Sequence, residues 1–376
     1  MAEIELLVGF FLTQSEEQMR PVHKNPANPS YQAPATFSFS GKSAKSVAKV
    51  LNVPSPNNIA APVCLNTWHR FLRGDKSLPG TKTQQKEAVK AIQNKVADSY
   101  KLATVPLTQE LGSFCSFCET PIPGLLEVEH CVPKSEYPIF SLSWDNFLLA
   151  CSPCNTAKGN VPSRSTVRTW AQNPIRSEND FYNEIRLRHY VWADLGGHSH
   201  ALLPVWLEAY DDQVKTWNAL PMNQATHLDN TMVSHDISKR EITARVFDPV
   251  ANAHVPRIVR SQLVPSANNV ARATEMVSLC ELNDNGTLTS TYDRRVLNRT
   301  VAWFRCLISL KTYFAQTDQH LKAMTWNMLL QNAAAVGFYS TWLTIIRTHS
   351  PKLAKQFVTD TAKQMYYPGT DVSKLP

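Results

Sequence analysis

The stretch LEVEHCVPKS, residues 126–135, places an acid and a histidine, Glu129 and His130, side by side among apolar residues. On its own it would suit a half-buried strand in almost any fold. Its neighbours are more specific. FCSFCE at residues 114–119 lies upstream, and LLACSPCNTAKGN at residues 148–160 lies downstream. The Glu-His pair is therefore bracketed by two C-x-x-C pairs.

These two cysteine pairs predict a structural zinc site. Thirty-two residues separate the pairs, and the chain's other four cysteines are scattered singly, which is not the pattern of a disulfide framework. Four thiolates at such local spacing are the ligand set of a closed tetrahedral zinc site. The predicted ligands are Cys115, Cys118, Cys151 and Cys154. The alternative is a chance pairing of reduced cysteines.

The zinc would fix the geometry of the segments between and after the cysteines. LEVEH is expected to form one strand, WDNFLLAC to run into a second, and SPCNTAKGN to open a helix. Metal-bound cysteines at the base of these elements would bring Glu129, His130, Asn146 and Asn155 together. A histidine, an acid and an amide in one place predict a site for a divalent cation and an activated water.

The ordered motifs E-H-x-x-P-K-S and W-x-N-x-x-L-x-C-x-x-C-N-x-x-K-G-N resemble the HNH endonucleases, the ββα-metal family, in a form with four zinc cysteines. The resemblance covers about fifty of the 376 residues. It implies that His130 is the general base and that Glu129 and Asn155 hold the catalytic cation. It also implies that Asn146 braces the loop that orients His130, and that Lys158 lies near the phosphate.

The sequence departs from the family pattern at both predicted cation ligands. Relatives often have aspartate where this chain has Glu129, and histidine where it has Asn155. Glu127, two residues before Glu129 on the same strand face, is a possible substitute ligand. Hard oxygen ligands favour Mg²⁺ or Mn²⁺, so the resemblance implies two metals, zinc for folding and a hard cation for cleavage of DNA.

Positive charge is concentrated in the first third of the chain. The net charge is +7, but residues 20–101 contain thirteen Lys and Arg against three acids, so they carry 13 − 3 = +10. Residues 106–169 contain four basic residues and six acids. Affinity for nucleic acid is therefore expected to come from the basic segment, through contacts to phosphates.

A helix is predicted over residues 82–101, KTQQKEAVKAIQNKVADSYK. Its apolar residues recur at three- and four-residue spacing: Val89, Ile92, Val96 and Tyr100. Lys82, Lys86 and Lys90 recur every four residues on another face and are the predicted nucleic-acid-binding residues. The alternative is that this lysine row is simply a solvated helix face.

The predicted fold class is α+β with three segments. Residues 1–105 are a basic N-terminal arm and helical segment, residues 106–165 are the zinc-bound ββα-metal module, and residues 166–376 are a mainly helical partner or regulatory domain. Helices are expected in SANNVARATEMVSLCELN, residues 266–283, and in NRTVAWFRCLISLKTYF, residues 298–314.

One long stretch without charge, residues 323–346, has three interpretations. Its many polar side chains favour a buried helix over a membrane span, and a partner-binding face is the third possibility. The apolar run at residues 4–12 has Glu3 and Glu5 at its start instead of the basic flank of a signal peptide. We therefore expect a cytoplasmic protein without membrane insertion.

Short outer motifs add a weaker resemblance. MRPVHK at residues 19–24 and RATEMVSLCELN at residues 272–283 are similar to the nuclease subunits of Septu and retron-linked bacterial anti-phage systems. That family's nucleases work with an ATPase of the structural-maintenance-of-chromosomes type. The resemblance implies an antiviral defence effector with an ATPase partner, which the uncharged stretch would contact.

Two rival functions remain. A zinc-ribbon module that binds nucleic acid without catalysis would keep the cysteines but would not need His130 or Asn155. An interaction subunit would carry a nuclease that is silent until a partner releases it. Elsewhere, His198 and His200 could form a metal pair, but a turn is the simpler interpretation because no cysteine or acid lies beside them.

Overall fold

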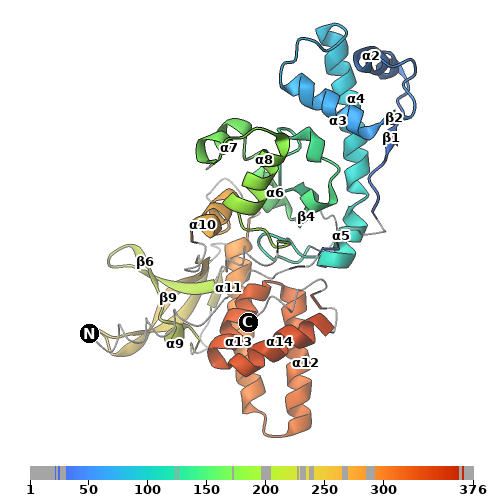
Figure 1. Ribbon diagram of the computed structural model, residues 1–376. Coiled ribbons are helices and arrows are strands. Elements are labelled where there is room, and N and C mark those ends of the chain that lie inside the picture. Colours follow the sequence, from blue (N-terminus) through green and yellow to red (C-terminus); the bar gives the residue numbers. More distant parts are fainter. Residues whose placement is uncertain are drawn as a thin grey trace. The chain divides into compact units, whose positions relative to one another are not determined.

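The structure is a computed structural model (Figure 1). The residues it describes are 22, 24–25, 31–122, 124, 127–171, 173–195, 205–226, 228, 234–236, 241–264, 270–284, 293–363 and 366–367. Contacts divide the chain into two compact units. Unit 1 comprises Met1–His23, Leu111–Gly124 and Tyr190–Pro376, and unit 2 comprises Lys24–Glu110 and Leu125–His189. Each unit contains residues from more than one of the three segments predicted from the sequence.

The first part of unit 2 is a small helical lobe. Its elements are β1 (Thr36–Phe37), α2 (Lys42–Leu51), β2 (Ile59–Ala60), α3 (Ala61–Leu72), α4 (Lys82–Lys101) and α5 (Thr104–Leu111). The predicted helix over residues 82–101 is confirmed as α4, and its N-terminus is fixed by a capping box between Thr81 and Gln84. Val89, Ile92 and Val96 are buried in the core of this lobe.

The second part of unit 2 contains two short strands followed by a helix. β3 (Glu127–His130) pairs antiparallel with β4 (Phe147–Ala150), so that His130 lies opposite Phe147. The helix α6 (Ser152–Lys158) begins directly after β4, with Pro153 in its first turn, where a missing N–H has no cost. The predicted strand-strand-helix order of the module is therefore confirmed.

Further short helices complete unit 2. They are the 3₁₀ turns η1 (Pro138–Phe140) and η2 (Trp144–Asn146), then α7 (Arg164–Trp170), α8 (Glu178–Asn183) and the π-helical turn η3 (Glu184–His189). Arg186 of η3 is buried and reaches the loop beside the strands. Its guanidinium donates to the carbonyl oxygen of Asp145 at 2.8 Å and to Sγ of Cys131 at 3.1 Å.

Unit 1 contains an antiparallel five-stranded sheet that the sequence interpretation did not foresee. The strand order is β6-β5-β9-β8-β7. The strands are β5 (Val205–Asp211), β6 (Thr216–Ala219), β7 (Ser234–Asp236), β8 (Glu241–Asp248) and β9 (Ala253–Leu263). Val205, Leu207 and Ala209 are buried and alternate with more exposed residues, which is the period of a one-sided sheet. The region after residue 166 is thus helical with an inserted sheet.

Six helices accompany this sheet in the described part of unit 1. They are α9 (Met222–Ala225), α10 (Val270–Leu279), α11 (Arg295–Ala315), α12 (Gln319–Val336), α13 (Tyr339–His349) and α14 (Pro351–Lys363). Helices α10 and α11 confirm the two helices predicted in this region. The buried residue Arg295, at the start of α11, forms an ion pair with Asp293 at 2.6 Å.

The uncharged stretch at residues 323–346 is not one helix. It covers most of α12 and α13, which are separated at Gly337 and Phe338, both with positive φ. The first eight residues of α13 are buried, so the interpretation as buried helix fits this part. None of the helices in the described part of the chain combines the length and apolar character that a membrane span requires.

The first cysteine knuckle packs against the start of α13 within unit 1. The carboxylate of Glu119 accepts hydrogen bonds from the backbone N–H of Ser340 at 2.8 Å and from its hydroxyl at 2.7 Å. A carboxylate at a helix N-terminus satisfies free N–H groups and interacts favourably with the helix dipole. The backbone N–H of Phe338 also donates to the Glu119 carbonyl oxygen at 3.0 Å.

Candidate functional site

The four predicted zinc ligands form a cluster. One ligand atom from each of Cys115, Cys118, Cys151 and Cys154 lies within 4.8 Å of the other three. All four cysteines are buried and none is in a disulfide. A zinc–sulfur bond of about 2.3 Å places the sulfurs of a tetrahedral site roughly 4 Å apart, so this donor set fits one zinc ion.

His130, at the end of β3, is enclosed by aromatic rings and a backbone carbonyl. The Tyr100 ring of α4 lies edge-on to it at a centroid distance of 4.7 Å, and the Phe147 ring of β4 lies edge-on at 5.1 Å. Nε2 of His130 is 3.0 Å from the carbonyl oxygen of Ser141. A carbonyl oxygen only accepts, so Nε2 carries the proton and Nδ1 of the neutral ring has a free lone pair.

The imidazole stays neutral at ordinary pH. Burial, and to a lesser extent the positive charge of Lys134, lowers the pKa of His130 to about 3, while the bond to Ser141 opposes the shift. Nδ1 is buried and has no hydrogen-bond partner among the described residues. A buried acceptor without a partner is costly, which points to a partner that is not part of the protein chain.

Asn146 holds the loop that follows His130. Its Oδ1 accepts from the backbone N–H of Val132 at 2.7 Å, and its Nδ2 donates to the carbonyl oxygens of Val132 at 2.9 Å and Phe140 at 3.1 Å. The side chain is completely buried. It therefore ties the chain just after His130 to the segment that precedes Ser141.

Glu129 forms a buried ion pair with Lys158. Nζ of Lys158, at the end of α6, lies 2.7 Å from Oε1 of Glu129, and the side chains are 0% and 9% exposed. Burial raises the pKa of Glu129, while Lys158 acts in the opposite direction. Lys158 does not reach solvent in this conformation, so it would contact a phosphate only after leaving Glu129.

Asn155, in the middle of α6, contacts the other acid of the strand. Its side-chain Nδ2 donates to the carboxylate of Glu127. Glu127 and Glu129 point to the same face of β3, and both are thus joined to α6. Two carboxylates and an amide oxygen within one strand-helix contact are hard oxygen donors of the kind that Mg²⁺ and Mn²⁺ take.

The contacts of the predicted site residues in unit 2 form two groups, one around His130 and one between β3 and α6. Asn155 and Lys158 each meet an acid of β3, and Asn146 braces the loop beside His130. The sequence interpretation did not identify Tyr100, Ser141 or Lys134 as part of this site. Lys134 lies over the Tyr100 ring, 5.1 Å from its centroid. Lys134 is itself the lysine of P-K-S in the motif, which was the one available signal.

The predicted nucleic-acid-binding lysines lie on the exposed face of α4. Lys82, Lys86 and Lys90 are all exposed, whereas Val89 and Ile92 of the same helix are buried. They lie in the same unit as His130 but outside the strand-helix site. His198 and His200, the pair interpreted as a turn, lie outside the described residues.

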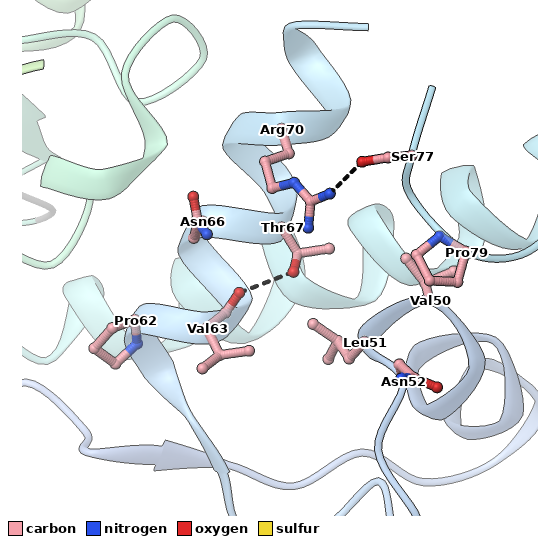
Figure 2. A pocket seen from close by; sticks show the side chains of 10 residues that line it. All are labelled: Val50, Leu51, Asn52, Pro62, Val63, Asn66, Thr67, Arg70, Ser77 and Pro79. Carbon is pink, nitrogen blue, oxygen red and sulfur yellow. Dashed lines mark hydrogen bonds between the residues drawn. The ribbon is translucent and has the colours of Figure 1, made fainter. Parts of the chain in front are cut away.

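A hollow of about 600 Å³ opens elsewhere in unit 2, between α2 and α3. Figure 2 shows its lining, which includes Val50, Val63 and Asn66. The one charged residue of the lining, Arg70, is already bound to Asp75 at 2.7 Å and to Ser77 at 2.8 Å. No acid, histidine or cysteine lines this hollow, so it offers neither a base nor hard metal ligands.

Comparison with known proteins agrees with the central module. Residues 115–161 match the family model described as HNH endonuclease. No curated protein and no solved structure matches the chain significantly. The matched segment begins at the first cysteine of the cluster and ends just after α6, so it contains the cysteines, both strands and His130. The chain therefore carries an HNH endonuclease domain at residues 115–161, with four cysteines that could bind zinc.

Proposed function

We propose that the protein is a metal-dependent endonuclease that hydrolyses phosphodiester bonds of DNA, with His130 as the general base. The observation that carries this proposal is the tautomer of His130. The bond from Nε2 to the Ser141 carbonyl leaves the lone pair of Nδ1 available, and burial keeps the ring neutral. A neutral imidazole with an available lone pair can accept a proton from a water.

The reaction follows from this arrangement. His130 Nδ1 accepts a proton from a water whose oxygen forms a bond to phosphorus. The bond from phosphorus to the leaving oxygen breaks, and the leaving oxygen takes a proton from solvent. Asn146 and Ser141 keep the imidazole in the tautomer that can accept this proton. After release of the product, the proton on Nδ1 passes to solvent, which restores the neutral ring.

Glu129, Glu127 and Asn155 are the residues that would hold a divalent cation. Nζ of Lys158 lies 2.7 Å from the Glu129 carboxylate, so a cation that binds there would displace this ammonium group. Mg²⁺ or Mn²⁺ bound there supplies positive charge that stabilises the phosphorane and the leaving oxygen. The cysteine cluster would hold a structural Zn²⁺, because a closed thiolate site has no open position for a substrate.

A second candidate is a nuclease that is silent until released, and one observation favours it. Lys158 neutralises Glu129, and Asn155 is bonded to Glu127, so the three proposed cation ligands are engaged within the chain. The resemblance of the outer motifs to Septu and retron-linked nucleases supports an ATPase partner as the releasing factor and a role in antiviral defence. Of the first of these motifs, only Val22 and Lys24 lie within the described residues. Eight cysteines without a disulfide support the cytoplasm as the compartment.

The decisive experiment is cleavage of plasmid DNA by the wild type and by His130→Ala, each with Mg²⁺, with Mn²⁺ and with a chelator. We expect the wild type to cut when a divalent cation is present and His130→Ala to be inactive while it retains zinc and fold. His235→Ala, at an exposed histidine of β7, is the matched control and should cut like the wild type. Equal cutting by His130→Ala would remove the proposed base.

The same assay separates the alternatives. A wild type that binds plasmid but never cuts it, with or without a partner ATPase, would favour the zinc ribbon without catalysis. Cutting that begins only when the partner ATPase and ATP are added would identify the silent nuclease. A single-stranded RNA of similar length, tested beside the plasmid, decides between DNA and RNA as the substrate.

A further inference from the structure

Helix α2 carries a row of lysines that the HNH domain does not include. Lys42, Lys45 and Lys49 are exposed at spacings of three and four residues, so they share one face. The opposite side of the helix is buried through Val47 and Val50. Residues 24–74 contain no aspartate or glutamate. The next acid, Asp75, is bound to Arg70 at 2.7 Å. This row is therefore not neutralised by neighbours in the sequence.

The α2 row and the lysines of α4 border the same edge of the contact between the two helices. At that edge, the Ser46 hydroxyl donates to Glu87 at 2.7 Å. Around the axis of α2, Ser46 lies between the buried Val50 and the lysine face. Around the axis of α4, Glu87 lies between the half-buried Ala91 and the face of Lys86 and Lys90. The two lysine rows therefore lie on either side of the Ser46–Glu87 hydrogen bond. The two helices are packed together, with axes about 8–10 Å apart.

These six lysines are a free positive surface. None of them forms an ion pair with an acid in the described part of the chain. Glu87 is the one acid at the edge between the two rows, and it accepts from Ser46. Such a surface fits a polyanion with regularly spaced charges better than a small ligand, because the lysines are spread over two helices and none of them lines the described hollow between α2 and α3.

Helix α4 also sets the distance from this surface to the histidine. Its C-terminal end contacts β3, where Tyr100 lies edge-on to His130 at 4.7 Å. At a rise of about 1.5 Å per residue, Lys90 is about 15 Å and Lys82 about 27 Å from Tyr100 along the helix. Phosphates follow one another about every 3.4 Å along a strand of a duplex. This offset therefore corresponds to roughly four to eight nucleotides.

We propose that the lysines of α2 and α4 form one anchoring surface for the backbone of a nucleic-acid duplex, about four to eight nucleotides from the phosphate that is cleaved at His130. This inference rests on the proposed function. It adds a second row, Lys42, Lys45 and Lys49, and a geometric requirement: the duplex must extend past the cleaved bond on one side far enough to reach α2 and α4. Phosphate contacts of this kind are indifferent to sequence.

Binding is measured first, in the His130→Ala background, so that cleavage does not interfere. A labelled 30-base-pair duplex is titrated at several salt concentrations with the background protein and with the added triple change K42E/K45E/K49E. We expect at least tenfold weaker binding, and a salt slope that falls by about 0.9 for each phosphate that the lysines no longer neutralise. K82E/K86E/K90E should act in the same way.

The matched control is K311E/K352E/K355E, which reverses three exposed lysines on α11 and α14. It changes the net charge by the same amount and should bind within twofold of the background protein. Equal affinity and salt slope for K42E/K45E/K49E would overturn the anchoring surface. So would a background protein that binds an acidic protein or anionic vesicles but no duplex.

Cleavage of a length series tests the offset separately. Duplexes with flanks of 3 and of 12 base pairs on one side of the cut are compared in the otherwise wild-type protein. We expect a lower KM for the longer flank, and loss of this advantage in K42E/K45E/K49E. An equal KM for both flanks would overturn the offset. Cutting by His130→Ala would instead overturn the proposed function, whatever the binding results are.

Discussion

The ammonium group of Lys158 lies 2.7 Å from the carboxylate of Glu129, and the lysine side chain is fully buried. Removal of one partner leaves the other charge without compensation in a low-dielectric environment, whereas removal of both does not. We therefore expect Glu129→Gln to lower the free energy of unfolding by about 3–5 kcal/mol. The double change Glu129→Gln/Lys158→Met should recover most of this loss. Urea unfolding in the presence of zinc measures both.

An exposed ion pair provides the control for this comparison. Arg70 and Asp75 also lie 2.7 Å apart, but their side chains are 37% and 30% exposed. Solvent screens such a pair, so Asp75→Asn should cost much less than Glu129→Gln. If the double variant were as unstable as Glu129→Gln alone, the loss of stability would come from the missing ion pair itself and not from an uncompensated buried charge.

Asn146→Ala should disorganise the loop beside His130. The change removes three hydrogen bonds and leaves backbone groups of Val132 and Phe140 buried without a partner. We expect a loss of about 3 kcal/mol in the free energy of unfolding, since each such group costs about 1–3 kcal/mol. Asn160→Ala, which removes a single exposed bond with Ser135, is the control and should be nearly neutral. Equal stability of both variants in denaturant unfolding would contradict the bracing role.

Cys151→Ser should lose the metal of the cysteine cluster. Three thiolates and a hydroxyl bind zinc much less tightly than four thiolates, and a structural zinc contributes directly to folding. We expect elemental analysis to find about one zinc per wild-type chain and far less in Cys151→Ser. Cys64→Ser is the control: this buried thiol lies outside the cluster, and burial raises its pKa to about 11. Loss of zinc from Cys64→Ser instead would argue against the assigned ligands.

The central module was predictable because its signals are local. Closely spaced cysteines, the run of apolar residues before Cys151 and a proline after it identify β3, β4 and α6 within a few residues. The partners of the polar residues were not predictable. Glu129 was expected to face a cation, but whether Lys158 or Asn155 reaches it depends on where α6 lies over the strands. That position is set by packing, which spacing along the chain does not specify.

The five-stranded sheet was missed even though its signal was present. In β5, buried Val205, Leu207 and Ala209 alternate with Trp206 and Glu208, which is the period of a strand. Three of the five strands have seven residues or fewer, and polar segments separate the strands, so they stand out less than the long amphipathic helices that follow. Sheet pairing joins β5 to β9, about fifty residues later, and this long-range pairing has no local marker.

Gly337→Ala should destabilise the packing of the first cysteine knuckle against α13. Gly337 has φ of +77°, and an added Cβ would lie 2.5 Å from both the Glu119 carbonyl oxygen and Cδ of Pro121. Backbone atoms and a proline ring can shift only slightly, so the free energy of unfolding should fall by about 1–3 kcal/mol. Thermal unfolding measures it. Gly74→Ala is the control, because Gly74 has a similar φ of +68° and nothing within 4 Å of an added Cβ. Equal losses of stability in Gly337→Ala and Gly74→Ala would mean that the positive φ alone causes the effect.

The stability of the protein should depend on His130 between about pH 6.5 and pH 3. The pKa is lowered to about 3 in the folded state, against an ordinary 6.5 in the unfolded state. In this range the unfolded chain binds a proton that the folded chain does not, so stability is lost as the pH falls. Near pH 5 this proton adds about 1.4 kcal/mol per pH unit to the slope of the free energy of unfolding against pH.

The variant His130→Asn lacks this proton and should show a shallower slope of unfolding free energy against pH. Both proteins keep the four cluster cysteines, so loss of zinc in acid affects them alike and cancels in the difference. Urea unfolding at pH 5.5, 5.0 and 4.5 gives the two slopes. If they were equal, His130 would titrate alike in the folded and unfolded states, and the buried, neutral imidazole on which the proposed base depends would be wrong.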